Sequence, residues 1–207
     1  MTVRVLIVSI AGREERRRVT LHRALSHLQM QTIPVQVLVV VSGHTSNLRE
    51  WRCWIGNEFP NVEYLWSDQP LSQSEGWKLV AQTKPWNDDD LLLLHDDDDT
   101  SHADRCRIQR DAILQRHSSI ITAVPVWQPS KPPSRAARAD CFAIPFGTDT
   151  PGLGMTMCSF RRLMCDCGSS KDRFQDIKLW RHIRKSDFYL IEGAPLYYVR
   201  SSAMEKI

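Results

Sequence analysis

Three short, almost unbroken apolar segments constrain the fold more than any other feature of the sequence. Residues 3–10, 35–41 and 91–94 each have the length of a single strand and are apolar at nearly every position. Strands that are apolar on both faces are typical of parallel sheets covered by helices on both sides. Between the first two, residues 13–30 repeat apolar positions at the three- and four-residue spacing of a helix. We therefore expect an α/β fold with a mostly parallel central sheet covered by helices.

The rest of the chain is expected to continue this alternation. Further helices are expected at 48–59, 74–82, 103–116 and 174–184, further strands at 62–66, 120–126 and 188–199, and a proline-rich basic loop at 128–140. A chain of 207 residues with 42% hydrophobic and 25% charged residues is typical of one globular domain. No apolar run approaches the ~18 residues that a membrane-spanning helix needs. The apolar start of the chain lacks a signal-peptide cleavage site, so we expect a cytoplasmic protein with no membrane span.

Acidic residues are concentrated in one part of an otherwise basic chain. The net charge is +3, from 27 basic and 24 acidic residues, and seven of the acids lie in two runs, 88–90 and 96–99. Without those seven, 27 basic residues would face 17 acids, which is a net charge of +10. This distribution favours a protein that binds a cation and an anionic ligand together.

The second acidic run directly follows the apolar strand 91–94. In open α/β sheets, ligands bind beyond the carboxyl ends of the strands. Two carboxylates ~5 Å apart repel by roughly 3 kcal/mol at an effective dielectric of 20, so four in a row favour a bound cation. Ligands that are all oxygen favour Mn²⁺ or Mg²⁺. An exposed acidic turn is the alternative, and it is the interpretation that we expect to hold for the first run, 88–90.

The order of motifs along the chain resembles the GT-A glycosyltransferases, in particular the large inverting family 2 type. That family begins with a strand, an arginine-containing helix and a Gln-Thr-x-Pro turn. The matching segments are the strand 3–9, Arg13, QTIP at 31–34, SEGWK at 74–78, LLLLHDDDDTSHAD at 91–104, the glycine segment 152–155, and QDIKL at 175–179. In three places the chain departs from the family. Val-Ser-Gly stands at 41–43 where acids are usual, Gln175 replaces a Glu, and residues 197–202 lack the histidine that often completes the family's metal site.

The resemblance implies a single GT-A catalytic domain over residues 1–207. Residues 1–104 would form the nucleotide-sugar-binding half and residues 105–207 the acceptor-side half. The donor would be a nucleoside-diphosphate sugar.

The resemblance also implies which side chains hold the donor and the metal. Asp96 would lie near the ribose and the metal, and Asp98 would be the first choice as a direct metal ligand. Asp97 and Asp99 are equivalent candidates to assist, because a shift of register by one residue fits equally well. Arg13, Trp77 and Lys78 would line the donor site, although a surface arginine and a core tryptophan are competing explanations.

On the acceptor side, the resemblance implies that Asp176 is the general base of an inverting transfer to a hydroxyl group. The competing explanation is an acid in the first turn of a helix, where it complements the dipole. Basic residues in the acceptor-side segments favour a polyanionic acceptor, such as nucleic acid with a hydroxylated base. These residues are Lys131, Arg135, Arg138, Arg161 and Arg162. A small-molecule, lipid-linked or polysaccharide acceptor is the broader expectation for the family.

Two other classes of protein fit parts of the pattern. A nucleotidyltransferase also uses carboxylates and Mg²⁺ on an α/β sheet, but Ala11-Gly12-Arg13 is a poor phosphate-binding loop. A non-enzymatic, basic nucleic-acid-binding module would use the aspartates only to balance charge.

Overall fold

A seven-stranded, mostly parallel sheet forms the centre of the computed structural model. The structure describes residues 1–12, 15–116, 120–124, 126–127, 152–167, 183, 188–191 and 197–198. The strand order is β3-β2-β1-β4-β8-β6-β9, and β8 runs antiparallel to both of its neighbours. The strands are β1 (Val3–Ile10), β2 (Gln36–Ser42), β3 (Glu63–Ser67), β4 (Leu91–His95), β6 (Ile121–Ala123), β8 (Leu153–Thr156) and β9 (Phe188–Leu190). The predicted α/β architecture is confirmed.

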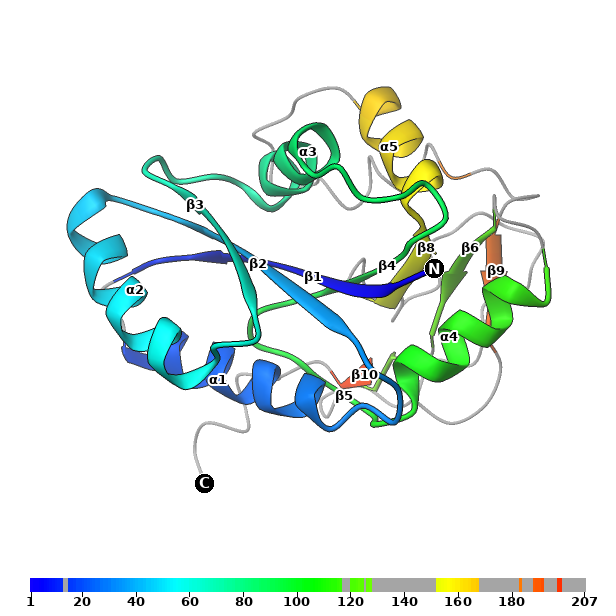
Figure 1. Cartoon of the computed structure of the whole chain (residues 1–207), viewed down its shortest axis with the longest axis horizontal. Helices are drawn as coiled ribbons and strands as arrows, with labels where there is room; N and C mark the ends of the chain where they lie inside the picture. Colours follow the sequence, from blue (N-terminus) through cyan, green and yellow to red (C-terminus); the bar gives the residue numbers. More distant parts are fainter. Residues whose placement is uncertain are drawn as a thin grey trace.

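Helices cover both faces of this sheet (Figure 1). On one face lie α1 (Glu15–Gln29), α2 (Thr45–Glu58) and α4 (Arg105–Leu114), and on the other lie α3 (Gln73–Thr83) and α5 (Met157–Asp166). Alternate residues of β1 point to opposite faces of the sheet. Val5 and Ile7 pack in the core on the side of α1 and α2, and Leu6 packs in the core on the side of α3 and α5. This double burial explains why the strands are apolar at nearly every position. Within the described residues, no helix has both the length and the apolarity that a membrane crossing requires.

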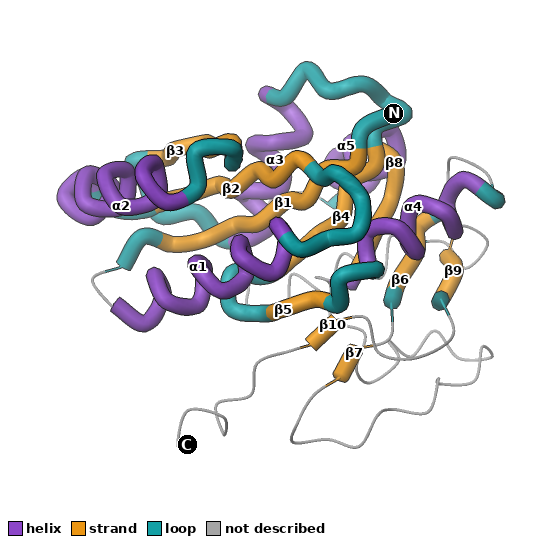
Figure 2. The backbone as a smooth tube through the Cα atoms, turned by 60° about the horizontal axis from the view of Figure 1, so that its bottom comes forward, coloured by secondary structure: helices purple, strands orange, loops and turns teal. Residues whose placement is uncertain are grey.

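A second, smaller sheet lies beside the main one (Figure 2). It consists of β5 (Thr100–Ser101), β10 (Tyr197–Tyr198) and β7 (Val126–Trp127), in that order. The single strand predicted at 120–126 is therefore divided between two sheets, with β6 in one and β7 in the other. A proline at position 125 separates the two segments in the sequence, and proline cannot donate to a strand ladder. The helix predicted at 174–184, apart from residue 183, and the loop predicted at 128–140 lie outside the described residues.

The first acidic run differs from the expected solvated turn. Asp88 and Asp89 are exposed, but Asp90 is only 1% exposed. Its carboxylate accepts hydrogen bonds from the backbone N–H of Thr2 (2.8 Å) and from Nε and Nη2 of Arg4 (3.0 and 2.9 Å). The prediction was wrong for Asp90, because Thr2, just before β1, and Arg4, on β1, supply donors that make its burial favourable.

The backbone of the same run holds the start of α5. The carbonyl of Asp90 accepts from the N–H of Met157 at 2.8 Å, and the carbonyl of Asp88 accepts from the N–H of Cys158 at 3.0 Å. These are N–H groups of the first helical turn, which have no partner inside the helix. The guanidinium of Arg161, one turn later, donates to the carbonyls of Lys84 and Trp86, both at 2.9 Å. The run therefore joins β1, β4 and α5, and it lies at the end of β4 away from the second acidic run.

Candidate active site

The candidate site lies where two neighbouring parallel strands end. β1 and β4 pair with Ile7 opposite His95, so their carboxyl ends meet at one edge of the sheet. The aspartates 96–99 follow β4 directly at this edge. They therefore occupy the position at which α/β sheets bind ligands.

Three of the four aspartates come together. Asp96, Asp98 and Asp99 each offer a carboxylate oxygen, and these oxygens lie within 4.8 Å of one another. Asp99 is buried, Asp96 is half-buried and Asp98 is exposed, so the group extends from the protein interior to the surface. At this spacing each pair of charges repels by about 3 kcal/mol at an effective dielectric of 20, and a divalent cation would relieve that repulsion. An all-carboxylate donor set fits Mn²⁺ or Mg²⁺.

The fourth aspartate, Asp97, points elsewhere. Its carboxylate accepts a hydrogen bond from the hydroxyl of Ser9 at 2.5 Å and lies 3.8 Å from the guanidinium of Arg17. Burial raises the pKa of Asp97, while the Ser9 hydroxyl acts in the opposite direction. The strand pairing explains the contact, since Ser9 and Asp97 each lie two residues beyond Ile7 and His95, the last pair of the β1–β4 ladder. The structure thus separates Asp97 from Asp99, two residues that the sequence left equivalent.

Two further side chains hold the acidic loop from the neighbouring helices. The amide Nε2 of Gln73, in the first turn of α3, donates to Oδ1 of Asp96 at 2.6 Å. A guanidinium nitrogen of Arg23, on α1, lies 3.5 Å from the carbonyl of Asp98. The sequence interpretation missed Ser9, Arg17, Arg23 and Gln73. For Gln73 a signal was present, because the Ser72-x-x-Glu75 capping box predicts that the helix begins at residue 73.

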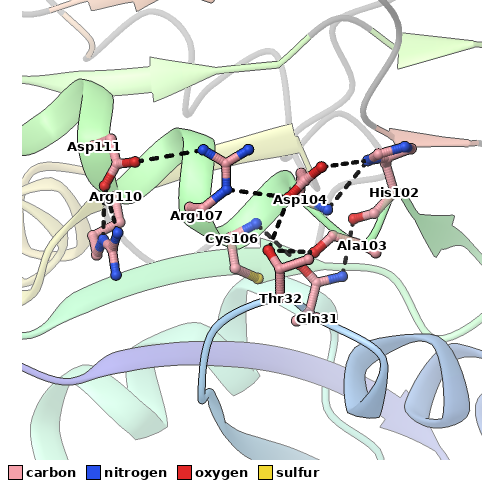
Figure 3. A network of polar contacts seen from close by, with 9 residues as sticks. All are labelled: Gln31, Thr32, His102, Ala103, Asp104, Cys106, Arg107, Arg110 and Asp111. Atoms are coloured by element: carbon pink, nitrogen blue, oxygen red, sulfur yellow. Dashed lines mark hydrogen bonds and ion pairs between the residues drawn. The ribbon is translucent and has the colours of Figure 1, made fainter.

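The Gln-Thr turn after α1 fastens the chain beyond the acidic loop (Figure 3). The side chain of Gln31 donates to the carbonyl of His102 and accepts from the N–H of Cys106, both at 3.0 Å. The hydroxyl of Thr32 donates to Oδ1 of Asp104 at 2.9 Å, and this hydrogen bond is the largest of the causes that lower the pKa of Asp104. The turn therefore fixes the path of the chain from the aspartates into α4. This structural role accounts for the Gln-Thr motif at residues 31 and 32.

His95, the last residue of β4 and the residue before the aspartates, is a packed histidine. Its ring is 2% exposed, and burial, followed by the nearby charge of Arg105, lowers its pKa to about 3. Arg105 is itself fully buried and donates to the carbonyl of Leu94 (2.7 Å) and to the side chain of Gln109 (2.9 Å). The ring of His95 is therefore neutral at physiological pH.

The remaining predicted site residues have different outcomes. Trp77 is 2% exposed and packs in the core with Leu6 and Phe160, which agrees with the competing core explanation. Its place in the donor site stays a prediction. Lys78, the next residue on α3, is half-buried. Arg13 and Asp176 lie outside the described residues, so their roles stay predictions.

The sequence matches no protein-family model and no curated protein. Among solved structures, S. aureus TarS 1–349 in complex with UDP-GlcNAc aligns with a TM-score of 0.67 and 13% identity, over 100% of this chain and 61% of that chain. Mouse xyloside xylosyltransferase 1 aligns with a TM-score of 0.58 and 8% identity, over 98% of both chains. A 4-diphosphocytidyl-2C-methyl-D-erythritol synthase aligns with a TM-score of 0.52 and 13% identity, over 94% of this chain and 90% of that chain.

These alignments concern the fold, since the identities are low, and this chain spans about three fifths of the length of TarS 1–349. The sheet order, the helices on both faces and the acidic loop after β4 are features of this structure that do not depend on the alignments. The predicted fold is confirmed: the chain has the fold of the GT-A glycosyltransferases.

Proposed function

We propose that the chain is a metal-dependent glycosyltransferase. It transfers a sugar, with inversion, from a nucleoside-diphosphate sugar to a hydroxyl acceptor. The observation that supports this most is the group of Asp96, Asp98 and Asp99, which lies at the carboxyl edge of β4 in a GT-A fold. The UDP and UDP-GlcNAc complexes of the structurally similar TarS support a nucleotide sugar as the donor.

At the donor side, different described residues would bind the metal, position the acidic loop and attract the anionic donor. Asp96, Asp98 and Asp99 would hold Mn²⁺ or Mg²⁺, which when bound neutralises the charge that develops on the diphosphate leaving group. Ser9 and Asp97 fix the path of the loop between these ligands. Arg17, which is 44% exposed beside Asp97, adds positive charge where an anionic donor would lie.

At the acceptor side, the proposal assigns the general base to Asp176. The acceptor oxygen forms a bond to the anomeric carbon as the bond from that carbon to the diphosphate oxygen breaks. Asp176 accepts the hydroxyl proton on the face opposite the leaving group. An Asp176→Asn variant should therefore bind the donor normally and lose turnover, and retained turnover would remove Asp176 from this role.

A thermal-shift assay tests the donor proposal. The full chain is heated with UDP, GDP, CDP and their sugars, each with and without Mn²⁺, starting with UDP-GlcNAc. The proposal expects at least one nucleotide to raise the melting temperature only when Mn²⁺ is present. If no nucleotide does so, the donor proposal fails.

For the acceptor, we propose a hydroxylated base in nucleic acid. The support is the excess of basic residues outside the acidic runs. Neutralising phosphates releases counterions, so binding to such an acceptor should weaken steeply as salt rises. Binding that does not change with salt would exclude nucleic acid and favour a small-molecule, lipid-linked or polysaccharide acceptor.

Nucleotidyl transfer is the second candidate, because the diphosphocytidyl synthase aligns over nearly the whole of both chains. A backbone contact at the end of β1 opposes a phosphate-binding loop there. Such a loop directs its N–H groups at phosphate, but the N–H of Ala11 donates to the carbonyl of Ser42 at 2.7 Å. Release of pyrophosphate from CTP or UTP in the presence of Mg²⁺ would favour this candidate over sugar transfer.

A further inference from the structure

We infer that Gln73 is a positioning residue for the metal site, which it serves by orienting the carboxylate of Asp96. The inference rests on the proposed function, because it concerns the same three aspartates. Its basis is the 2.6 Å hydrogen bond from Nε2 of Gln73 to Oδ1 of Asp96. The donor comes from α3 and the acceptor from the loop after β4, so the contact joins two elements that are separate in sequence.

Two features fix the start of α3, and therefore the position from which Gln73 reaches Asp96. The first is a complete capping box, in which the Ser72 side chain accepts from the Glu75 N–H and the Glu75 carboxylate accepts from the Ser72 N–H at 2.8 Å. The second is a close approach to the sheet at Gly76. A Cβ at this position would lie 2.7 Å from Cγ1 of Val8, so only glycine lets the helix pack this closely on β1.

β1 contacts both α3 and the acidic loop, and it therefore fixes the position of Gln73 relative to the metal site. Val8 on β1 contacts α3, and the next residue, Ser9, donates to Asp97 of the acidic loop. The strand that precedes the loop, β4, is the direct neighbour of β1. The start of α3, which carries Gln73, and the acidic loop are therefore both held against β1. A rotation of the Asp96 side chain would break its hydrogen bond to Gln73, because neither element is free to follow it.

The physical need for such a residue follows from the charges. Asp96 must keep an oxygen within 4.8 Å of oxygens on Asp98 and Asp99, although like charges favour turning it away. A neutral amide that donates to Oδ1 of Asp96 holds the carboxylate without competing for the cation as a positive side chain would. Partners of this kind, which hold ligands rather than the metal, typically change metal affinity by about 10- to 100-fold.

The test measures Mn²⁺ binding to the full chain, without nucleotide, from the electron paramagnetic resonance signal of free Mn²⁺. The variants are Gln73→Leu, which removes the amide donor, and Gln73→Asn, which keeps the amide on a shorter side chain. Gln82→Leu is the matched control, since Gln82 is exposed at the other end of α3. The melting temperature of each metal-free variant is recorded alongside.

We expect the Mn²⁺ dissociation constant to rise about tenfold or more in both Gln73 variants. It should stay at the wild-type value in Gln82→Leu, with metal-free melting temperatures of the Gln73 variants near that of the wild type. Wild-type Mn²⁺ affinity in both Gln73 variants overturns the inference and leaves the proposed function standing, even if their melting temperatures fall. No Mn²⁺ binding by the wild type overturns the inference together with the metal dependence of the proposed function.

Discussion

Replacement of Asp90 perturbs a buried charge that holds two strands together. The Asp90 carboxylate is 1% exposed and accepts three hydrogen bonds, from the Thr2 N–H and from two nitrogens of Arg4. Asp90→Ala leaves all three donors without this acceptor. Asp90→Asn keeps one amide oxygen but removes the charge that pairs with the guanidinium.

The expected loss of stability follows from this burial. Removing one partner of a buried ion pair costs about 3–5 kcal/mol. The side chain of Arg4 is 13% exposed, and its guanidinium also lies over the Trp86 ring, 4.5 Å from the ring centroid. Solvent and this ring would still stabilise the Arg4 charge after Asp90 is replaced. We therefore expect a loss of about 3 kcal/mol for Asp90→Ala and about 1–2 kcal/mol for Asp90→Asn.

The loss should depend on pH in a defined direction. Burial alone would raise the pKa of Asp90, but the hydrogen bonds from Thr2 and Arg4 outweigh burial and hold that pKa below its ordinary value. The folded carboxylate therefore stays charged at a pH where the unfolded one is protonated. The stabilisation is fully present above about pH 4 and disappears as the pH falls through the folded-state pKa. The difference between wild type and Asp90→Asn should shrink accordingly.

Urea denaturation at a series of pH values measures these differences. The matched control is Asp89→Asn, which changes an exposed residue in the same run and should alter stability by no more than about 0.5 kcal/mol. Equal effects of Asp90→Ala and Asp89→Asn at pH 7 would contradict the stabilising role of the buried ion pair. A difference between wild type and Asp90→Asn that grows in acid would contradict the lowered pKa of Asp90.

Three further substitutions have defined outcomes. Gly154→Ala would place a Cβ 2.5 Å from Cδ2 of Leu93, so it should destabilise the chain by about 1–3 kcal/mol in thermal denaturation. Gly56→Ala, within α2 and with no atom within 4 Å of the new Cβ, should stabilise it by up to about 1 kcal/mol; a loss there would contradict the packing described. Ser9→Ala removes the hydrogen bond to Asp97 and should weaken Mn²⁺ binding measured by calorimetry, and unchanged affinity would show that this bond does not shape the metal site.

Much of the fold could be predicted because the central strands are buried on both faces, which leaves continuous apolar segments in the sequence. β1, β2 and β4 are apolar on both faces, and each lies within two residues of its predicted ends. The helix α5 was missed, although its buried residues Met157, Phe160 and Met164 repeat at helical spacing. The antiparallel strand β8 was missed for a different reason, since its place between β4 and β6 depends on pairing between distant segments.

The candidate site, like β8, depends on contacts between segments that are distant in the sequence. The position of the acidic run after an apolar strand was enough to predict a metal site, but not which aspartates face one another. That division depends on Ser9, which is 88 residues from Asp97 in sequence and lies beside it only through the pairing of β1 with β4. The burial of Asp90 likewise depends on Arg4, which is 86 residues away. Local patterns do not contain such contacts.

The proposed function requires that Asp96, Asp98 and Asp99 hold a divalent cation on which binding of the nucleotide-sugar donor depends. Calorimetric titration of UDP-GlcNAc, and of the corresponding GDP and CDP sugars, into the wild type and Asp98→Asn measures this dependence. We predict that one donor binds the wild type with Mn²⁺ present, does not bind after the metal is chelated, and binds Asp98→Asn at least tenfold more weakly. Equal donor binding by wild type and Asp98→Asn, or binding that persists after chelation, would contradict the claim.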